Sequence, residues 1–326
     1  MAWTRVLWAL VAVLGVPLVL CTYLFAVERT IDRLPPRRRN GTRPWLWLLP
    51  GFLLLCVFLV YPVFHTLVLS LMNADSTRFV GLANFVHIFT ARSMLTVLRN
   101  NLLWLLLFPS VTVVFGLIIA VLTDRVRYEW AVKASIFVPM AISLVAAGVI
   151  WKFMYQYQPP GEPQTGTVNS LLSLAIPAFR PRAWLFDRSL NNFALILVLV
   201  WMWVGFAMVI LYAALKGIDE ALLEAARLEG ASEFQIFFRI TLPLMMPTVI
   251  VVTTTLVISV LKVFDVVYVM TNGALDTDVV ANRMYKEMFN YNDFGRASAF
   301  AMLLLLAVVL VMFINIRRFG RRAGEM

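Results

Sequence analysis

Residues 224–230 read Glu-Ala-Ala-Arg-Leu-Glu-Gly, and after nine more residues the chain reads Ile-Thr-Leu-Pro at 240–243. This polar stretch lies between two long apolar runs, at about 191–215 and 244–271. Connections between packed helices usually have about two to eight residues, whereas this one has room for two short helices. We therefore interpret it as a docking element for a soluble partner.

The stretch carries start and stop signals for both helices. Asp219 can cap a helix over Glu220–Glu229, and Gly230 can end it because glycine adopts a left-handed conformation at little cost. Ser232 and Gln235 have the spacing of a capping box for a second helix. The apolar surface of that helix would come from Phe234, Phe237, Phe238 and Ile240. The sequence thus predicts a helix–turn–helix lying across one end of a helix bundle.

An amphipathic connector lying on the lipid surface is the alternative interpretation. A lipid-surface helix favours Lys and Arg on its polar face. Here Glu224 and Glu229 flank the small pair Ala225 and Ala226, which suits a groove in a protein better. The chain would then re-enter the membrane at Pro243.

The rest of the chain is too apolar for an ordinary soluble domain, since 61% of its 326 residues are hydrophobic and 14% are charged. A helix needs roughly 20 apolar residues to span a bilayer. Backbone polar groups in hydrocarbon must be satisfied internally, so these spans should be helices. We expect an all-α polytopic membrane protein with about seven spans, at 6–27, 45–71, 95–122, 134–156, 191–215, 244–271 and 297–316.

The net charge of +10 is distributed as the positive-inside rule requires. Basic residues cluster at 29–43, 125–133 and 317–322, and alternation of the spans puts all three clusters on the cytoplasmic side. The docking stretch then lies inside, the N-terminus outside and the C-terminus inside. The pattern indicates that the basic residues set the membrane topology and contact anionic lipid, and it argues against nucleic-acid binding. Cys21 and Cys56 fall within predicted spans and have no metal or disulfide spacing.

The expected outer segment 157–190 is rich in Pro and Gly around residues 159–166. It predicts an irregular loop with one short helix near 168–176 lying on the membrane surface. A contact surface for an external partner is the other interpretation, and the residues alone leave both open.

The pattern Glu-Ala-Ala, three residues, Gly, nine residues, Ile-x-Leu-Pro resembles the characteristic loop of permease subunits in ATP-binding-cassette importers. In that family the loop forms the coupling helix, which docks in a cleft of the cytoplasmic ATPase. The resemblance assigns ATPase docking to Glu224, Ala225, Ala226, Arg227, Glu229, Gly230, Ile240, Leu242 and Pro243.

The resemblance covers about residues 45–316. Segments 79–85, 264–273 and 293–299 are similar to the carbohydrate branch of the family, of the maltose and sn-glycerol-3-phosphate type. Segments 262–265, 276–278 and 283–286 resemble alpha-glucoside permeases. This implies a type I importer permease (MetI-like) fold at 45–316, with coupling helices at 219–243. It also implies an extra transmembrane helix and basic cytoplasmic linker at 1–44, and a basic cytoplasmic tail at 317–326.

Ionisable groups within a span rarely face lipid. Lys262 and Asp265 stand three residues apart in the sixth predicted span, on nearly the same helix face. They form either a structural ion pair or a wall of the translocation path. Trp201, Trp203, Ser259 and the Thr253–Thr255 run could bind sugar, or equally pack and bond their own backbone. Matching to the family places the pathway near Met202, Trp203 and Ser259.

No catalytic constellation is evident in the sequence, which has two histidines, His65 and His87, and no phosphate-binding loop. We expect no enzyme activity and no cofactor bound by this chain. The resemblance places ATP and Mg on two partner ATPase subunits, or one homodimeric ATPase.

The other expected partners are a second homologous permease, an extracytoplasmic solute-binding protein and a sugar, in the bacterial cytoplasmic (inner) membrane. The alternatives are a stand-alone channel or ion-coupled transporter, and a membrane scaffold without transport. The sequence does not identify the sugar.

Overall fold

The computed structural model describes residues 2–33, 35–124, 126–159 and 161–323. These residues are mostly helical, and within them no strand forms beyond one isolated bridge between Met72 and Phe79. The chain divides into two compact units, Met1–Thr66 and Leu67–Met326. The division falls inside the second predicted span, and the boundary expected at residue 44 stays a prediction.

The first unit is a pair of packed helices, α1 (Ala2–Ile31) and α2 (Pro36–Leu55), followed by a π-helical turn at Cys56–Val60. The Tyr23 hydroxyl donates to the Leu46 carbonyl at 2.6 Å. Glu28 accepts from the Trp47 indole at 2.7 Å and from Arg43 at 3.0 Å. Helix α3 (Tyr61–Ser70) crosses into the second unit.

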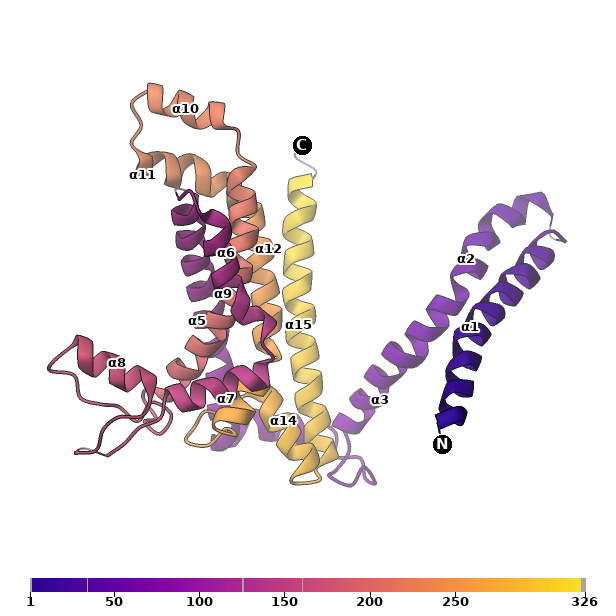
Figure 1. Ribbon diagram of the computed structural model, residues 1–326. Helices are drawn as coiled ribbons and strands as arrows, with labels where there is room; N and C mark the ends of the chain where they lie inside the picture. Colours follow the sequence, from indigo (N-terminus) through magenta and orange to yellow (C-terminus); the bar gives the residue numbers. More distant parts are fainter. Residues whose placement is uncertain (1, 34, 125, 160, 324–326) are drawn as a thin grey trace. The chain divides into compact units, whose positions relative to one another are not determined.

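The second unit is built around α9 (Asn191–Lys216), whose side chains are more buried than those of any other candidate span within the described residues. Its longest partner is α5 (Arg92–Thr123). The other helices are α4 (Ala83–Thr90), α6 (Glu129–Phe137), α7 (Leu144–Met154), α8 (Thr167–Ala175), α10 (Glu220–Leu228), α11 (Glu233–Ile236), α12 (Leu242–Leu261), α13 (Asp265–Met270), α14 (Val280–Phe289) and α15 (Phe294–Ala323). Figure 1 shows α10 and α11 at one end of this unit and α7, α8 and α14 at the other.

Glycines let the helices around α9 approach closely. A Cβ at Gly116 on α5 would lie 2.8 Å from the Ala207 Cβ. A Cβ at Gly205 would lie 2.4 Å from the Ile136 carbonyl oxygen and 2.8 Å from the Phe137 Cα. Because those last two atoms are backbone, α9 packs against the end of α6 only if residue 205 has no side chain.

Within the described residues, six helices are long and apolar enough to cross a membrane, and a bent pair makes a seventh candidate. The bent pair corrects the single span expected at 134–156, because Glu129–Ala141 and Leu144–Met154 meet at 102°. Pro139 has no amide hydrogen to continue the helix. Ser143 then caps α7 by accepting from the Ala146 amide at 3.1 Å.

The span expected at 244–271 is also broken, and the placement of Lys262 and Asp265 on one helix face is wrong. Helix α12 ends at Leu261, and Asp265 begins the separate helix α13. The last turn tightens, because Lys262 donates its amide to the Ser259 carbonyl only three residues back. Phe264 leaves the helical conformation at φ −139°, and a carboxylate at position 265 favours a new helix N-terminus. No ion pair joins Lys262 to Asp265 in the part of the chain that the structure describes.

Candidate functional site

The segment after α9 forms the turn-linked helices expected from its capping residues. Asp219 caps α10 by accepting from the Ala221 amide at 3.0 Å. Helix α10 ends at Leu228, so Glu229 is its C-cap and lies one residue beyond the expected helical body. Gly230 has φ +84°.

Two hydrogen bonds close the turn at Gly230. Its amide donates to the Arg227 carbonyl at 3.0 Å, and the Ala231 amide donates to the Ala226 carbonyl at 3.1 Å. This is the Schellman arrangement, which satisfies the last carbonyls of the helix and requires a left-handed residue. The expected role of Gly230 as helix terminator is confirmed.

The capping box of the second helix is also present. The Ser232 hydroxyl accepts from the Gln235 amide at 3.3 Å, and the Gln235 side chain accepts from the Ser232 amide at 2.8 Å. However, α11 is a single turn that continues through the π-helical turn Phe237–Thr241 into α12. The expected separate second helix is therefore the first part of a continuous helical run from Glu233 to Leu261.

The α10–α11 segment presents exposed groups at one end of the second unit. Leu228 is 89% exposed and Phe234 is 72% exposed. Glu224, Ala225, Arg227, Glu229, Gly230 and Pro243 are exposed, and Ala226, Ile240 and Leu242 are half-buried. An Arg227–Glu233 ion pair at 2.8 Å spans the turn, and this hydrogen bond raises the pKa of the Arg227 guanidinium. Beneath the segment a cavity of about 550 Å³ is lined by residues including Leu223, Ile236 and Leu215.

A cluster of charged and aromatic groups ties the end of α9 to its neighbours. Lys216 pairs with Asp124 at 2.5 Å. The Tyr212 hydroxyl donates to Glu129, and the Lys133 ammonium lies 3.6 Å from the centre of the Tyr212 ring. Sequence reasoning missed this cluster because Lys133 was explained as one of the basic residues that set the membrane topology. The end of α9, which leads into the α10–α11 segment, is thus tied to the ends of α5 and α6.

The residues expected in the substrate pathway do not form one site. Met202 is 3% exposed inside α9, and Trp203 packs edge-on against Phe206 with ring centres 5.5 Å apart. The Ser259 hydroxyl donates to the Thr255 carbonyl at 2.8 Å. The hydroxyls of residues 253–255 likewise bond carbonyls four residues earlier.

Lys262 lines a cavity of about 530 Å³ between the break after α12, α14 and α15. Phe264 and Tyr285 line the same cavity. They belong to a ladder in which Tyr268 lies 5.0 Å from Phe264 and 5.3 Å from Tyr285, measured between ring centres. Met202, Trp203, Ser259 and Asp265 do not line this cavity. Of the expected pathway residues, Lys262 alone opens onto it.

At the end opposite α10, buried asparagines hold the loop that follows α13. Asn100 donates to the carbonyls of Asp276 at 2.6 Å and Asp278 at 2.8 Å. Asn191 donates to the Leu275 carbonyl at 2.8 Å. Sequence reasoning missed these positions, although an asparagine pair within an apolar run was a usable signal, because buried amides must find partners.

We predict that Asn100→Leu loosens the loop after α13. The change removes the Asn100 donor from the Asp278 carbonyl and leaves the Asp276 carbonyl with only the longer bond from Asn192, at 3.3 Å. A buried group left unsatisfied costs about 1–3 kcal/mol. Amide hydrogen exchange across 275–280 should accelerate at least several-fold, whereas Asn290→Ala, at an exposed helix end, should leave it unchanged. Equal exchange in both variants and the parent would show that Asn100 does not hold the loop.

Residues 112–324 match the family described as binding-protein-dependent transport system inner membrane component. That match covers more than half of the chain and includes the α10–α11 segment. The chain belongs to this family. The expected all-α polytopic fold and the resemblance to importer permeases are thereby confirmed.

Two relatives are similar over most of their length. The osmoprotective compounds uptake permease protein GgtC of Synechocystis is 52% identical over 274 residues, covering 84% of this chain and 98% of the relative. The alpha-glucoside transport system permease protein AglF of Rhizobium meliloti is 46% identical over 289 residues, covering 88% of this chain and 85% of the relative.

A solved structure supports the same fold for the permease. The bacterial alginate ABC transporter in complex with an alginate pentasaccharide-bound periplasmic protein has a chain that matches with a TM-score of 0.70 at 26% identity. The match covers 88% of this chain and 98% of that one.

Proposed function

We propose that this permease works in a binding-protein-dependent importer for small alpha-glucosides and chemically similar neutral solutes. The α10–α11 segment is the observation that carries the proposal. Its capped helix, glycine turn and exposed Leu228 and Phe234 form a rigid surface suited to a cleft in a cytoplasmic ATPase. That end of the second unit would face the cytoplasm, as the basic residues at 125–133 and 317–322 require.

Two ATPase subunits, or one homodimeric ATPase, would supply the energy, with ATP and Mg bound by them and not by this chain. A second homologous permease and an extracytoplasmic solute-binding protein would complete the importer. The alginate transporter resembling this chain was solved with its periplasmic protein bound, which supports the last partner.

The cluster around Tyr212 suggests how motion would pass from the α10–α11 segment into the bundle. Closure of the ATPases would displace α10. Because Lys216 is paired with Asp124 on the end of α5, and Tyr212 is bonded to Glu129 on α6, the three helix ends would move together. Rigid-body motion of this kind can switch the opening of a path between the two sides.

The relatives support the substrate class. One relative at 46% identity is an alpha-glucoside permease, and another at 52% is a permease for osmoprotective compounds. The cavity beside Lys262 offers Phe264 and Tyr285 as apolar faces and an ammonium as hydrogen-bond donor. Rings with apolar faces and hydroxyl edges fit such a lining, so we place substrate contacts at Lys262 and keep Met202, Trp203, Ser259 and Asp265 as further candidates.

Uptake by the reconstituted importer would test the substrate class. Alpha-glucoside disaccharides should be transported and should compete with one another, whereas a beta-linked disaccharide should compete several-fold less. Competition by sugar-free osmoprotective solutes, with no response to alpha-glucosides, would assign the second substrate class instead. Uptake without any ATPase present would support a stand-alone transporter.

A further inference from the structure

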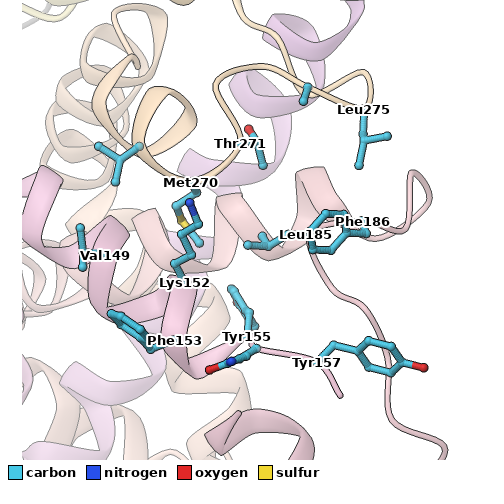
Figure 2. A pocket seen from close by; sticks show the side chains of 13 residues that line it. Val149, Lys152, Phe153, Tyr155, Tyr157, Leu185, Phe186, Met270, Thr271 and Leu275 are labelled. Atoms are coloured by element: carbon cyan, nitrogen blue, oxygen red, sulfur yellow. The ribbon is translucent and has the colours of Figure 1, made fainter. Parts of the chain in front are cut away.

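A third cavity, of about 650 Å³, lies beside α7 and the loop after α13. In Figure 1, α7 is at the end of the second unit opposite α10. Helix α7, the chain after it, Leu185 and Phe186, and the loop that follows α13 form its walls, as Figure 2 shows. Ligand pockets typically have volumes of about 300–1,000 Å³. None of the five expected pathway residues lines this pocket.

The floor of the pocket is buried and fixed. Tyr155, Leu185 and Met270 are each less than a tenth exposed. The Tyr155 hydroxyl donates to the Ala194 carbonyl in α9 at 3.1 Å. The floor is therefore attached to the central helix of the unit.

The walls are held by buried amides. Asn169 on α8 is fully buried, and its side chain donates to the carbonyls of Gln156 at 3.3 Å and Arg182 at 3.0 Å. It also accepts from the Trp184 indole at 2.9 Å. Asn191 holds the facing wall through the Leu275 carbonyl. Asn169 and Asn191 thus hold the chain in place on both sides of the pocket.

The rim carries exposed aromatic and polar side chains. Phe153 is 68% exposed and Phe186 is 75% exposed. In the described part of the chain neither ring pairs with another aromatic ring, and the Lys152 ammonium and Gln156 amide make no side-chain hydrogen bond. Apolar ring faces beside free amide and ammonium donors match the C–H faces and hydroxyl edges of a sugar ring.

We propose that this pocket binds one ring of a saccharide before it enters the translocation path. The proposal rests on the proposed function, because it assigns the pocket a ring of the transported sugar. Phe153 and Phe186 would stack on the ring, while Lys152 and Gln156 would bond its hydroxyls. A pocket on the permease itself would keep part of a longer saccharide in place while it leaves the delivering protein.

The test uses the whole importer without its binding protein, in nanodiscs, with maltotriose as the probe. Saturation-transfer NMR would report contact between protein and sugar, and uptake would be measured separately with the binding protein present. The double variant Phe153→Ser with Phe186→Ser should weaken maltotriose binding about tenfold, because it removes both of the large apolar ring faces at the rim. Phe89→Ser, at a 54% exposed ring on α4, is the matched control and should bind as the parent does.

Three results would overturn the pocket assignment. If the double variant binds maltotriose as the parent does and the importer still takes up alpha-glucosides, the pocket does not bind the saccharide, and the proposed function is unaffected. Loss of a bound phospholipid from the double variant, without a change in sugar binding, would assign the pocket to lipid. Absence of both uptake and binding in the parent importer, for every alpha-glucoside, would overturn the proposed function together with the pocket.

Discussion

Replacing Gly230 with valine should reduce coupled uptake at least about tenfold while the permease still inserts into the membrane. Residue 230 has φ +84°, and no atom lies within 4 Å of a Cβ built there. The substitution would therefore fail through backbone conformation and not through a clash. A left-handed conformation costs an L-residue about 1–2 kcal/mol, and a β-branched side chain makes it worse.

We expect the turn at residue 230 to lose its hydrogen bonds and α10 to change its orientation relative to α11. A penalty of about 1.4 kcal/mol already changes a docking equilibrium tenfold, so uptake should fall by at least about that factor. Uptake and sugar-stimulated ATP hydrolysis would be measured in proteoliposomes. Gly230→Asn is the matched control, since asparagine adopts the left-handed conformation more readily. Uptake that is equal in the valine and glycine forms would remove the coupling role of this turn.

Replacing Gly205 with valine should prevent the second unit from assembling. Even a Cβ at this position would stand 2.4 Å from the Ile136 carbonyl oxygen. Relief requires α9 and the end of α6 to separate. Overpacking of a well-packed core costs about 1–3 kcal/mol or more. We expect a several-fold loss of monodisperse protein after detergent extraction and a lower melting temperature.

Gly217→Ala provides the control for Gly205. Residue 217 follows α9 with φ −81°, and the nearest atoms to a Cβ built there lie at 3.5 Å and 3.6 Å. This variant should extract and melt as the parent does. A Gly205→Val protein with the parent's melting temperature would show that α9 and α6 are not in close contact.

Much of the α10–α11 segment could be predicted because its signals are local. Asp219, Gly230, Ser232 and Gln235 each act within a few residues of their own position. The observed caps follow the expectation, apart from the one-residue difference at Glu229. The prediction of a separate second helix was wrong. Hydropathy does not indicate that a π-helical turn at Phe237–Thr241 connects α11 to α12 without a break.

The breaks at residues 142 and 262 could not be predicted from apolar length. Both lie in apolar runs long enough for a single span. The mean hydropathy of a run does not indicate whether the helix axis bends within it. The asparagine contacts to the loop after α13 join residues from 84 to 178 positions apart. Such contacts depend on the tertiary fold, and the spacing of residues along the chain does not predict them.

Recovery of an ATPase with the tagged permease from gently solubilised membranes tests the central claim most directly. The account predicts an ATPase subunit bound to the parent chain. It also predicts at least a tenfold lower recovery after Glu224→Lys with Leu228→Asp, which changes the exposed surface of α10. Leu174→Asp, at an 82% exposed position on α8 at the opposite end, should leave recovery unchanged. Absence of any ATPase, or equal recovery in all three forms, would contradict the assignment of α10 as the docking helix.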